Sequence, residues 1–525
     1  MSYYYKIEKE TIFEDEEDKL SQTKTDRWIF GLLLIAIGLV PLLVGGHVKD
    51  VIGPNITNIE LLSSGLKGDL FTYYKMTVLI VITVIAVLLL LSKIMFMNGV
   101  LRKTKLNIFL GIFLAAIILS TLLSPSISIA LWGQFDRSDG AVSYICYLAL
   151  FFVAMNIQYP KRAIHYVMYI LYPFVFINFI LITMNFYGYD AMKYTPIQKF
   201  MTLFLPEGAS LGESSTLVGT LNQWNYMSGM FAIITVMYLA WAILDKNKIR
   251  SITNLFVAVA SLAIMLMSIS TSGFLTLVAF TPFLLIIAFK SESIKKGFLI
   301  LIVFYILSVP VFHVLATKDY RVWDESIGFI VKENPYFKKT PVALGTSYDI
   351  DILFGHKAYA ADSTFELPNL PERGVAAGSG RAYIWEKTIN LTMNRPLIGY
   401  GLDTLKYHFP HYNIDARSGM LDENTIIDKP HSMYVGIFYG TGIFGFIGFA
   451  GVLLLTVIFA VKIIFTRKHI LLSVLAIGWL AFLFQALFND SLPGTAGPMW
   501  AIAGIMMGLL LANNDIKEKN DGRDN

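Results

Sequence analysis

The sequence has one cysteine and few charged residues. Cys146 lies inside an apolar run of the 525-residue chain, so no intramolecular disulfide can form and no cysteine-ligated metal site is expected. Only 15% of the residues are charged, whereas a soluble domain has about 25%. The formal net charge of +4 is too small for this length to indicate a nucleic-acid partner. These shortages exclude a disulfide-stapled secreted protein and favour a chain embedded in lipid.

Motifs for nucleotide or metal chemistry are also missing. The sequence has no P-loop and no HExxH spacing. The pairs Asp349/Asp351 and Asp422/Glu423 are potential cation ligands, but neither has further ligands at a supporting spacing. We therefore expect no metal and no cofactor.

Long apolar runs separated by short polar breaks dominate the chain, which is 55% hydrophobic. A helix needs ~17–25 largely apolar residues to cross the hydrocarbon core of a bilayer. The segments that qualify are 28–44, 76–97, 107–123, 142–158, 166–186, 224–243, 253–270, 273–289, 297–315, 442–464, 470–488 and 499–513. The sequence thus predicts an all-α fold, a polytopic transmembrane bundle of about 12 spans.

The positions of Lys and Arg predict the orientation, because short basic loops stay in the cytoplasm. Basic residues recur in alternate breaks at 102–105, 161–162, 246–250, 290–296 and 467–468. Both termini are then cytoplasmic. The expected organisation is a cytoplasmic tail 1–27, spans one to nine within 28–315, a large extracytoplasmic loop 316–432, spans ten to twelve within 433–513 and a cytoplasmic tail 514–525. A loop this long exceeds a mere connector, so we expect a small folded cap.

Two segments at the outer side carry candidate catalytic residues. Arg381 and Trp385 share one face of a predicted helix, which precedes the turn Gly399–Gly401. An arginine at a helix start presents a planar fork to phosphate oxygens, although Arg381 pairing with Glu386 or with a carboxylate of the loop is the alternative.

His431 stands where the large loop re-enters the membrane. There it can accept a proton from a hydroxyl, or merely bond a backbone carbonyl. The glycines after it predict a helix broken near residues 440–442.

Two further segments carry candidate substrate contacts. Arg137 lies between two aspartates in an outer loop, where a solvated ion pair is the alternative to substrate binding. Asn222 and Asn225 flank Trp224 at the outer end of a span. Amides beside an aromatic ring suit sugar hydroxyls, but Asn222 as a helix cap and Trp224 as an interfacial anchor explain the pattern equally well.

Taken together, these segments resemble the O-antigen ligase and O-antigen polymerase family of bacterial membrane glycosyltransferases. The resemblance spans roughly residues 130–450. The motif GR-x-x-x-W, then P-x-x-G-x-G, then a histidine at the next membrane entry reads here as Gly380, Arg381, Trp385, Pro396, Gly399, Gly401 and His431. The stretches 133–140 and 219–225 also fit the family. The chain departs from it at Ser432, where asparagine is usual, and at the turn 270–274, which lacks the arginine of many members.

The resemblance implies a glycosyltransferase in the cytoplasmic membrane, with its active site on the extracytoplasmic side. The donor would be a glycan on undecaprenyl diphosphate, and a hydroxyl of a glycan or protein acceptor would attack its anomeric carbon. His431 would act as the general base or orient the acceptor, and Arg381, alone or together with Arg137, would neutralise the leaving diphosphate. Neither metal nor nucleotide would be required. The implied substrate-binding residues are Arg137, Asn222, Asn225, Trp385, Gly399 and Gly401.

The Lys-rich, cysteine-poor composition is typical of a low-GC Gram-positive source, which has no lipopolysaccharide core. We therefore favour a polymerase of surface polysaccharide repeats. A ligase that transfers the glycan to a protein or other surface acceptor is the alternative. Two further hypotheses assign the protein to other functional classes: a polysaccharide transporter or flippase, and a non-catalytic scaffold.

Overall fold

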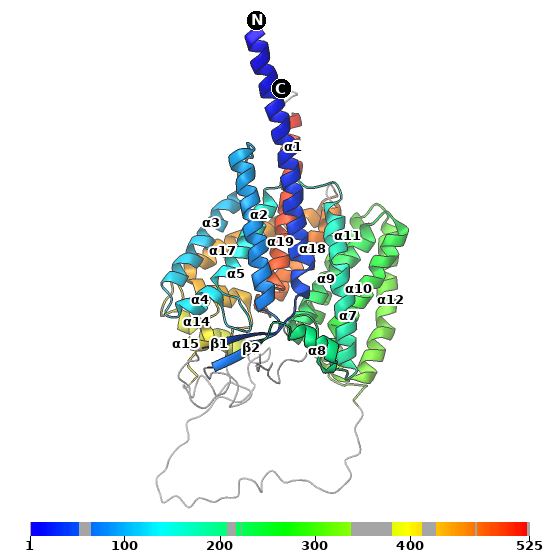
Figure 1. Cartoon of the computed structure of the whole chain (residues 1–525). Helices are drawn as coiled ribbons and strands as arrows, with labels where there is room; N and C mark the ends of the chain where they lie inside the picture. The colour runs from blue at the N-terminus through cyan, green and yellow to red at the C-terminus, as the bar shows by residue number, and fades with distance from the viewer. Residues whose placement is uncertain are drawn as a thin grey trace, which may run out of the picture.

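In a computed structural model, the protein is an elongated bundle of helices (Figure 1). The structure describes residues 2–51, 65–206, 217–221, 223–337, 381–411, 427–467 and 470–521. Within these ranges the strands are limited to one antiparallel hairpin, β1 (His47–Val51) with β2 (Gly65–Asp69), in which His47 pairs with Asp69. The predicted all-α class is confirmed.

The long helices run along the bundle, and short ones cover the end away from the termini (Figure 1). The long helices are α1 (Ser2–Gly38), α2 (Tyr73–Phe96), α3 (Lys105–Leu122), α5 (Ala141–Met155), α6 (Ala163–Ile170) followed by α7 (Tyr172–Phe186), α9 (Trp224–Leu244), α10 (Lys248–Met267), α11 (Thr271–Lys290), α12 (Ile294–Lys318), α17 (Met433–Phe465), α18 (Ser473–Gln485) and α19 (Ala496–Asp521). The short ones are α4 (Ile127–Trp132), α8 (Thr195–Met201), α13 (Arg321–Asp324), α14 (Arg381–Thr392) and α15 (Leu405–His408), with 3-10 turns at Val40–Leu42, Ala191–Lys193, Ile327–Phe329 and Ile470–Leu472.

Nine helices of the described residues are long and apolar enough to cross a membrane. Three shorter apolar helices, Ala141–Met155, Ile470–Gln485 and Ala496–Ala512, coincide with the other three expected spans. The 15 residues of α5 give a helix only about 22 Å long, against a hydrocarbon core of about 30 Å. The count of twelve spans stays a prediction.

The helices differ in how much protein surrounds them. The apolar window of α9 is 94% buried inside the bundle, whereas that of α12 is 22% buried. Trp241 on α9, Trp479 on α18 and Trp500 on α19 are among the largest fully buried side chains. The centre of the bundle is therefore α9 with α18 and α19, and α12 lies at its periphery with apolar side chains exposed, as in a helix that faces lipid.

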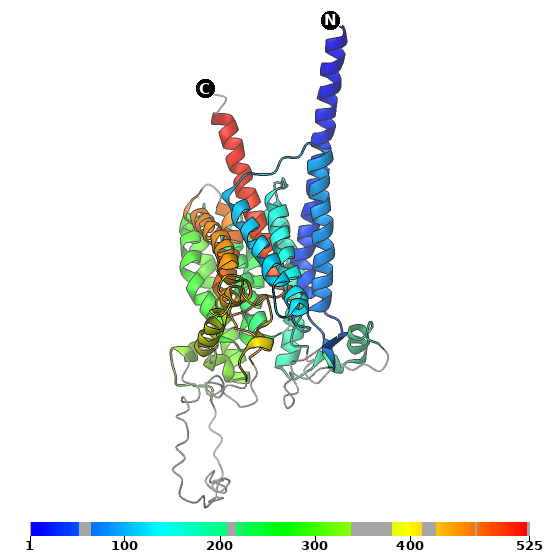
Figure 2. The same cartoon turned by 90° about the vertical axis from the view of Figure 1, so that its left-hand side faces the viewer.

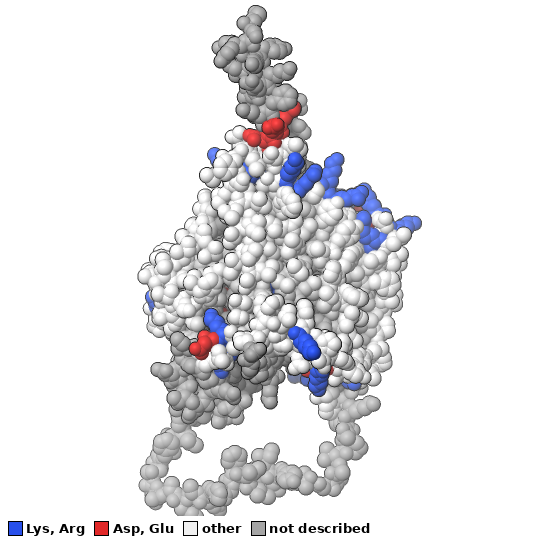
Figure 3. All heavy atoms as spheres, viewed as in Figure 1, with Lys and Arg blue, Asp and Glu red and all other residues white. Residues whose placement is uncertain are grey.

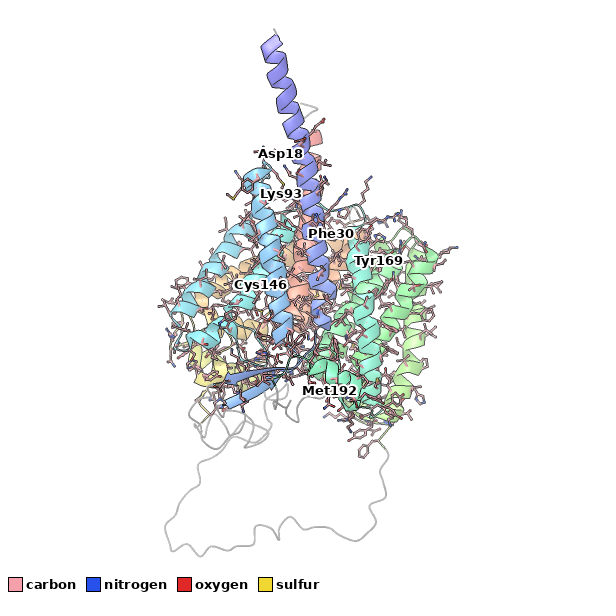
Figure 4. The ribbon with its side chains drawn as sticks, in the orientation of Figure 1. Asp18, Phe30, Lys93, Cys146, Tyr169 and Met192 are labelled. Carbon is pink, nitrogen blue, oxygen red and sulfur yellow. The ribbon has the colours of Figure 1, made fainter. Side chains whose placement is uncertain are left out.

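Both termini lie at the same end of the bundle (Figures 1 and 2). Lys and Arg side chains gather along the rim at that end, and the band below it shows few charges on this face (Figure 3). Lys93 and Asp18 lie toward this end and Met192 near the opposite one, with Cys146 between them (Figure 4). This distribution is the one expected of cytoplasmic termini.

Two helices depart from the expected boundaries. The helix α1 runs without interruption through the boundary expected between residues 27 and 28, and Asp26 forms a buried ion pair with Lys93 of α2 at 2.7 Å. The helix α17 begins at Met433, although a span was expected from residue 442. The glycines between these positions keep helical geometry up to Gly442, where φ is +61° and ψ is −164°. The predicted break near residues 440–442 is confirmed.

Candidate functional site

The candidate site is built around the segment 428–432, directly before α17, at the end of the bundle opposite the termini. His431 has a φ of +54°, and Asp403, whose loop packs on the same region, has a φ of +60°. Non-glycine residues rarely hold this left-handed conformation, and those that do cluster at functional sites. His431 is also about one-third exposed, at 33%, which leaves its imidazole accessible to a substrate.

The helix α14 is fixed against this segment. The indole Nε1 of Trp385 donates to the carbonyl of Pro430 at 2.8 Å. Arg381, one turn earlier on α14, is half-buried, and its Nε has no hydrogen-bond partner among the described residues. The structure thus brings together Arg381, Trp385 and His431. Glu386 lies near Lys387, at 3.7 Å, rather than pairing with Arg381.

Asp490 is a site residue that the sequence analysis missed. Its Oδ2 lies 3.7 Å from Nδ1 of His431 and, within the described part of the chain, has no hydrogen bond. Its side chain is only 11% exposed. A carboxylate beside one ring nitrogen orients the imidazole and stabilises its protonated form. The available signal was the polar break Asn489-Asp490-Ser491 between two apolar runs at the outer side.

Lys429 is the second missed residue. It is 5% exposed, and its ammonium lies 3.5 Å from the Gln223 amide oxygen and 3.5 Å from the Tyr226 hydroxyl. It also lies 5.5 Å from the centre of the Tyr226 ring. Among the described residues it forms no direct ion pair with a carboxylate, although its charge helps to lower the pKa of the neighbouring Asp428 carboxyl. A buried ammonium is costly without an anionic partner, so Lys429 is suited to an anionic ligand.

Partial burial lowers the pKa of the His431 imidazole below its ordinary value. The positive charges of Lys429 and Arg381 act in the same direction, whereas Asp490 and Asp428 oppose them. Burial likewise lowers the pKa of the Arg381 guanidinium, against the attraction of Asp490. At neutral pH His431 is therefore uncharged and able to accept a proton.

Arg137 is buried rather than solvated, with 3% of its side chain exposed. It forms ion pairs with Asp403 and, at 2.8 Å, with Asp428. Gln134 supports the same two residues, since its backbone N–H donates to the Asp403 carboxylate and its amide to the carbonyls of Asp403 and Asp428. The guanidinium is thus already neutralised, and it joins three segments that are distant in sequence.

The segment 396–401 pairs with the break in α17. The N–H groups of Tyr400 and Gly401 donate to the carbonyls of Tyr439 and Gly440, at 3.0 and 2.9 Å, and the N–H of Ile443 donates to the Pro396 carbonyl at 2.8 Å. A break in a helix frees backbone groups, and this segment satisfies them. Gly399 and Gly401 have φ of +68° and +97° and lie against backbone and Ser124. The structure places them at this junction.

Replacing Gly442 with alanine is expected to destabilise the protein. The left-handed backbone costs a non-glycine residue about 1–3 kcal/mol, and a Cβ at Gly442 would also overlap the backbone of Leu397. Thermal unfolding in detergent micelles measures the loss. Gly436→Ala on the same helix is the matched control, because its Cβ would meet only Pro430 at an ordinary 3.5 Å. Equal unfolding temperatures for the two variants would contradict the account of the break.

The segment around Trp224 is only partly described. Asn222 lies outside the described residues, so its predicted role stays a prediction. Asn225 is half-buried in the first turn of α9. The neighbours of these asparagines, Gln223 and Tyr226, are the ones that approach Lys429.

The turn that lacks an arginine is packed tightly. The Ser228 hydroxyl donates to the Ser270 carbonyl at 3.2 Å, and the Gln485 amide donates to the Ser272 carbonyl at 2.6 Å. Gly273 lies against Ser228, with no room for a Cβ. Lys429 and this turn both contact the first turns of α9, at Tyr226 and Ser228 respectively.

Comparison with protein families gives one match: residues 256–450 match the family model described as O-antigen ligase. No curated protein matches the chain. The matched segment contains Arg381, Trp385, Lys429 and His431, whereas Asp490 lies outside it. The match and the apolar helices support a multi-pass membrane protein that acts on a lipid-linked glycan in surface polysaccharide biosynthesis. The chain therefore carries an O-antigen ligase domain at residues 256–450, and its resemblance to the O-antigen ligase and polymerase family is confirmed.

Proposed function

We propose that the protein polymerises oligosaccharide repeats carried on undecaprenyl diphosphate at the outer face of the cytoplasmic membrane. The observation that carries this proposal is the arrangement around His431: a carboxylate, Asp490, beside one ring nitrogen, and two cations, Arg381 and Lys429, close by. A neutral base next to two cations that no described carboxylate pairs directly suits the transfer of a glycan from an anionic leaving group.

Each residue has a role in a direct displacement. The acceptor hydroxyl attacks the anomeric carbon of the donor while the bond from that carbon to the diphosphate oxygen breaks. Nδ1 of His431 faces Asp490, so Nε2 takes the hydroxyl proton and Asp490 stabilises the resulting imidazolium. The diphosphate leaves with the electron pair, and Arg381 and Lys429 neutralise it. The donor is already activated, so the step requires neither nucleotide nor metal.

Chain length in cells tests this proposal. Gels of lipid-linked and surface polysaccharide are compared between cells with the wild-type protein and cells without it. We expect single lipid-linked repeats to accumulate and long chains to disappear in the deletion strain. Long chains that persist on the lipid but never reach a surface acceptor would indicate a ligase instead. Repeats that stay on the inner leaflet would indicate a flippase.

The pH dependence of the reaction reports on His431. The base acts when deprotonated, and its pKa is lowered, so kcat/KM is expected to fall only as the pH drops through a value below 6.5. Asp490→Asn removes a charge that raises this pKa. The acid limb of the pH profile, where the rate falls as the base is protonated, should therefore move to lower pH, while kcat falls. Rates of polymer formation between pH 4.5 and 8 measure the shift.

Lys429→Gln is the opposing control for this experiment. It removes a charge that lowers the pKa of His431, so the acid limb should move to higher pH. Lys429→Arg keeps the charge and should leave the limb near its wild-type position. If the Asp490 and Lys429 variants shift the limb in the same direction, His431 is not the titrating base.

A further inference from the structure

A second cavity is lined by residues of the hairpin β1–β2, the start of α2 and the end of α4. These elements lie at the end of the bundle away from the termini (Figure 1). Its volume is about 370 Å³, within the range of small-molecule sites. It is lined by the hairpin residues His47 and Lys49, by Tyr73 and Thr77 of α2, and by Trp132 and Gln134. By contrast, the cavity beside Asp428 and Asp490 has only about 30 Å³, room for a water molecule or two.

Two aromatic rings offer faces to this cavity. Trp132 is 47% exposed and Tyr73 is 38% exposed. The ring of Tyr73 is held flat by His47, whose ring stacks on it with centres 3.4 Å apart and planes 6° apart. The electron-rich face of an aromatic ring attracts the polarised C–H groups on the flat face of a pyranose. Rigid, half-exposed rings at the wall of a cavity therefore suit a sugar.

Polar groups stand beside the rings. The Lys49 side chain is exposed on β1. The Gln134 side chain is only 3% exposed and donates to the carbonyls of Asp403 and Asp428, so it supports the wall of the cavity rather than offering a group to a ligand. No carboxylate belongs to the described lining of the cavity. Two ring faces with the polar groups of Lys49 and Thr77 beside them match a hydroxyl-bearing sugar.

The cavity adjoins the candidate site on the side away from Lys429. Asp428 bonds Arg137 and Gln134, toward α4, whereas Lys429 approaches Gln223 and Tyr226, at the start of α9. Two consecutive residues before His431 thus have different neighbours: Asp428 contacts Gln134, which lines the cavity, and Lys429 contacts the start of α9. In a direct displacement the attacking hydroxyl and the leaving group lie on opposite sides of the anomeric carbon.

We propose that this cavity between β1–β2, α2 and α4 binds a sugar unit of the acceptor glycan, with Trp132 and Tyr73 as its stacking surfaces. The assignment to the acceptor rests on the proposed function, because it places the leaving diphosphate near Arg381 and Lys429. The binding of a sugar by the cavity does not depend on catalysis, so the two are tested separately.

The test measures direct binding of a soluble glycan. The probe is the oligosaccharide repeat released by mild acid from the lipid-linked glycan of the source cells, which carries no diphosphate and no lipid. Binding to the full-length protein in nanodiscs is measured by saturation-transfer NMR and calorimetry. We expect Trp132→Ala to weaken binding at least tenfold. Thr77→Phe, which fills the cavity from an exposed position on α2 without removing a ring, should do the same.

Trp28→Ala is the matched control for loss of an interfacial tryptophan. Trp28 is 72% exposed on α1 and lies two residues from Asp26, which pairs with Lys93 near the other end of α2. The Trp28→Ala variant should bind the oligosaccharide as the wild type does. Each variant is used only after it elutes as a single species by size exclusion, and Thr77→Phe keeps the test decisive if Trp132→Ala does not fold.

Three results would overturn the proposal: wild-type affinity in both cavity variants, an equal loss in Trp28→Ala, or no binding by a wild-type preparation that makes polymer. His431→Ala should bind the oligosaccharide normally while making no polymer. If the wild type binds the oligosaccharide through the cavity but makes no polymer from lipid-linked repeats, the polymerase function fails and the sugar site stands.

Discussion

His431→Ala is expected to lower the rate of glycan transfer by about 10²–10⁴-fold, the usual contribution of a positioned general base. The imidazole is accessible, faces Asp490 through Nδ1 and is uncharged at neutral pH because partial burial lowers its pKa. Removing it leaves the acceptor hydroxyl without a proton acceptor, while Arg381 and Lys429 still hold the donor. The effect should therefore fall on kcat, with the KM for the donor nearly unchanged. Initial rates of chain elongation by the purified protein measure both constants.

His313→Ala is a suitable control for this experiment. His313 is exposed on α12, where its Nδ1 lies 2.9 Å from the Tyr336 hydroxyl. Its replacement should leave the rate within about twofold of wild type, since surface changes are usually worth under 0.5 kcal/mol. A wild-type rate for His431→Ala, or an effect confined to KM, would remove His431 from the chemistry.

Arg137→Met is expected to destabilise the folded protein by about 3–5 kcal/mol, because it removes one partner of a buried ion pair. The variant leaves the Asp403 carboxylate, which is only 5% exposed, without its cation. It also removes the bonds between Asp428, three residues before His431, and the loop that joins α4 to α5. Equilibrium unfolding in mixed detergent micelles measures the change.

Arg321→Met is the comparison for this effect. Arg321 pairs with Asp319 on the surface, where its side chain is 60% exposed. Exposed pairs contribute about 0–1 kcal/mol, so this variant should unfold almost as the wild type does. If Arg137→Met unfolds like Arg321→Met and instead raises the KM for the donor, Arg137 binds the diphosphate directly, as the resemblance to the family implies.

The sequence was sufficient for the helical class and for part of the site. Apolar runs and basic breaks depend on local composition, and they located the helices to within a few residues in most cases. Arg381, Trp385 and His431 were predicted from motifs, and in the structure Trp385 bonds Pro430, the neighbour of His431, with Arg381 one turn earlier on α14. The left-handed break at Gly442 was predictable because several glycines follow one another there.

The remaining residues of the site depend on contacts that no local pattern records. Arg137 meets Asp403 and Asp428 across 266 and 291 positions of the sequence. From the sequence, an arginine between two aspartates is expected to form a solvated ion pair. Only the fold shows that carboxylates distant in the sequence bury it. Asp490 reaches His431 from a loop between α18 and α19, and Lys429 reaches Tyr226 of α9 across 203 positions.

The most direct test of the account is polymerisation in a defined system. The purified protein is reconstituted in liposomes with the lipid-linked repeat as its only glycan, in EDTA and without nucleotides. The account predicts a ladder of lipid-linked chains that lengthens with time. Unchanged single repeats, under conditions where the folded protein is verified, would contradict it.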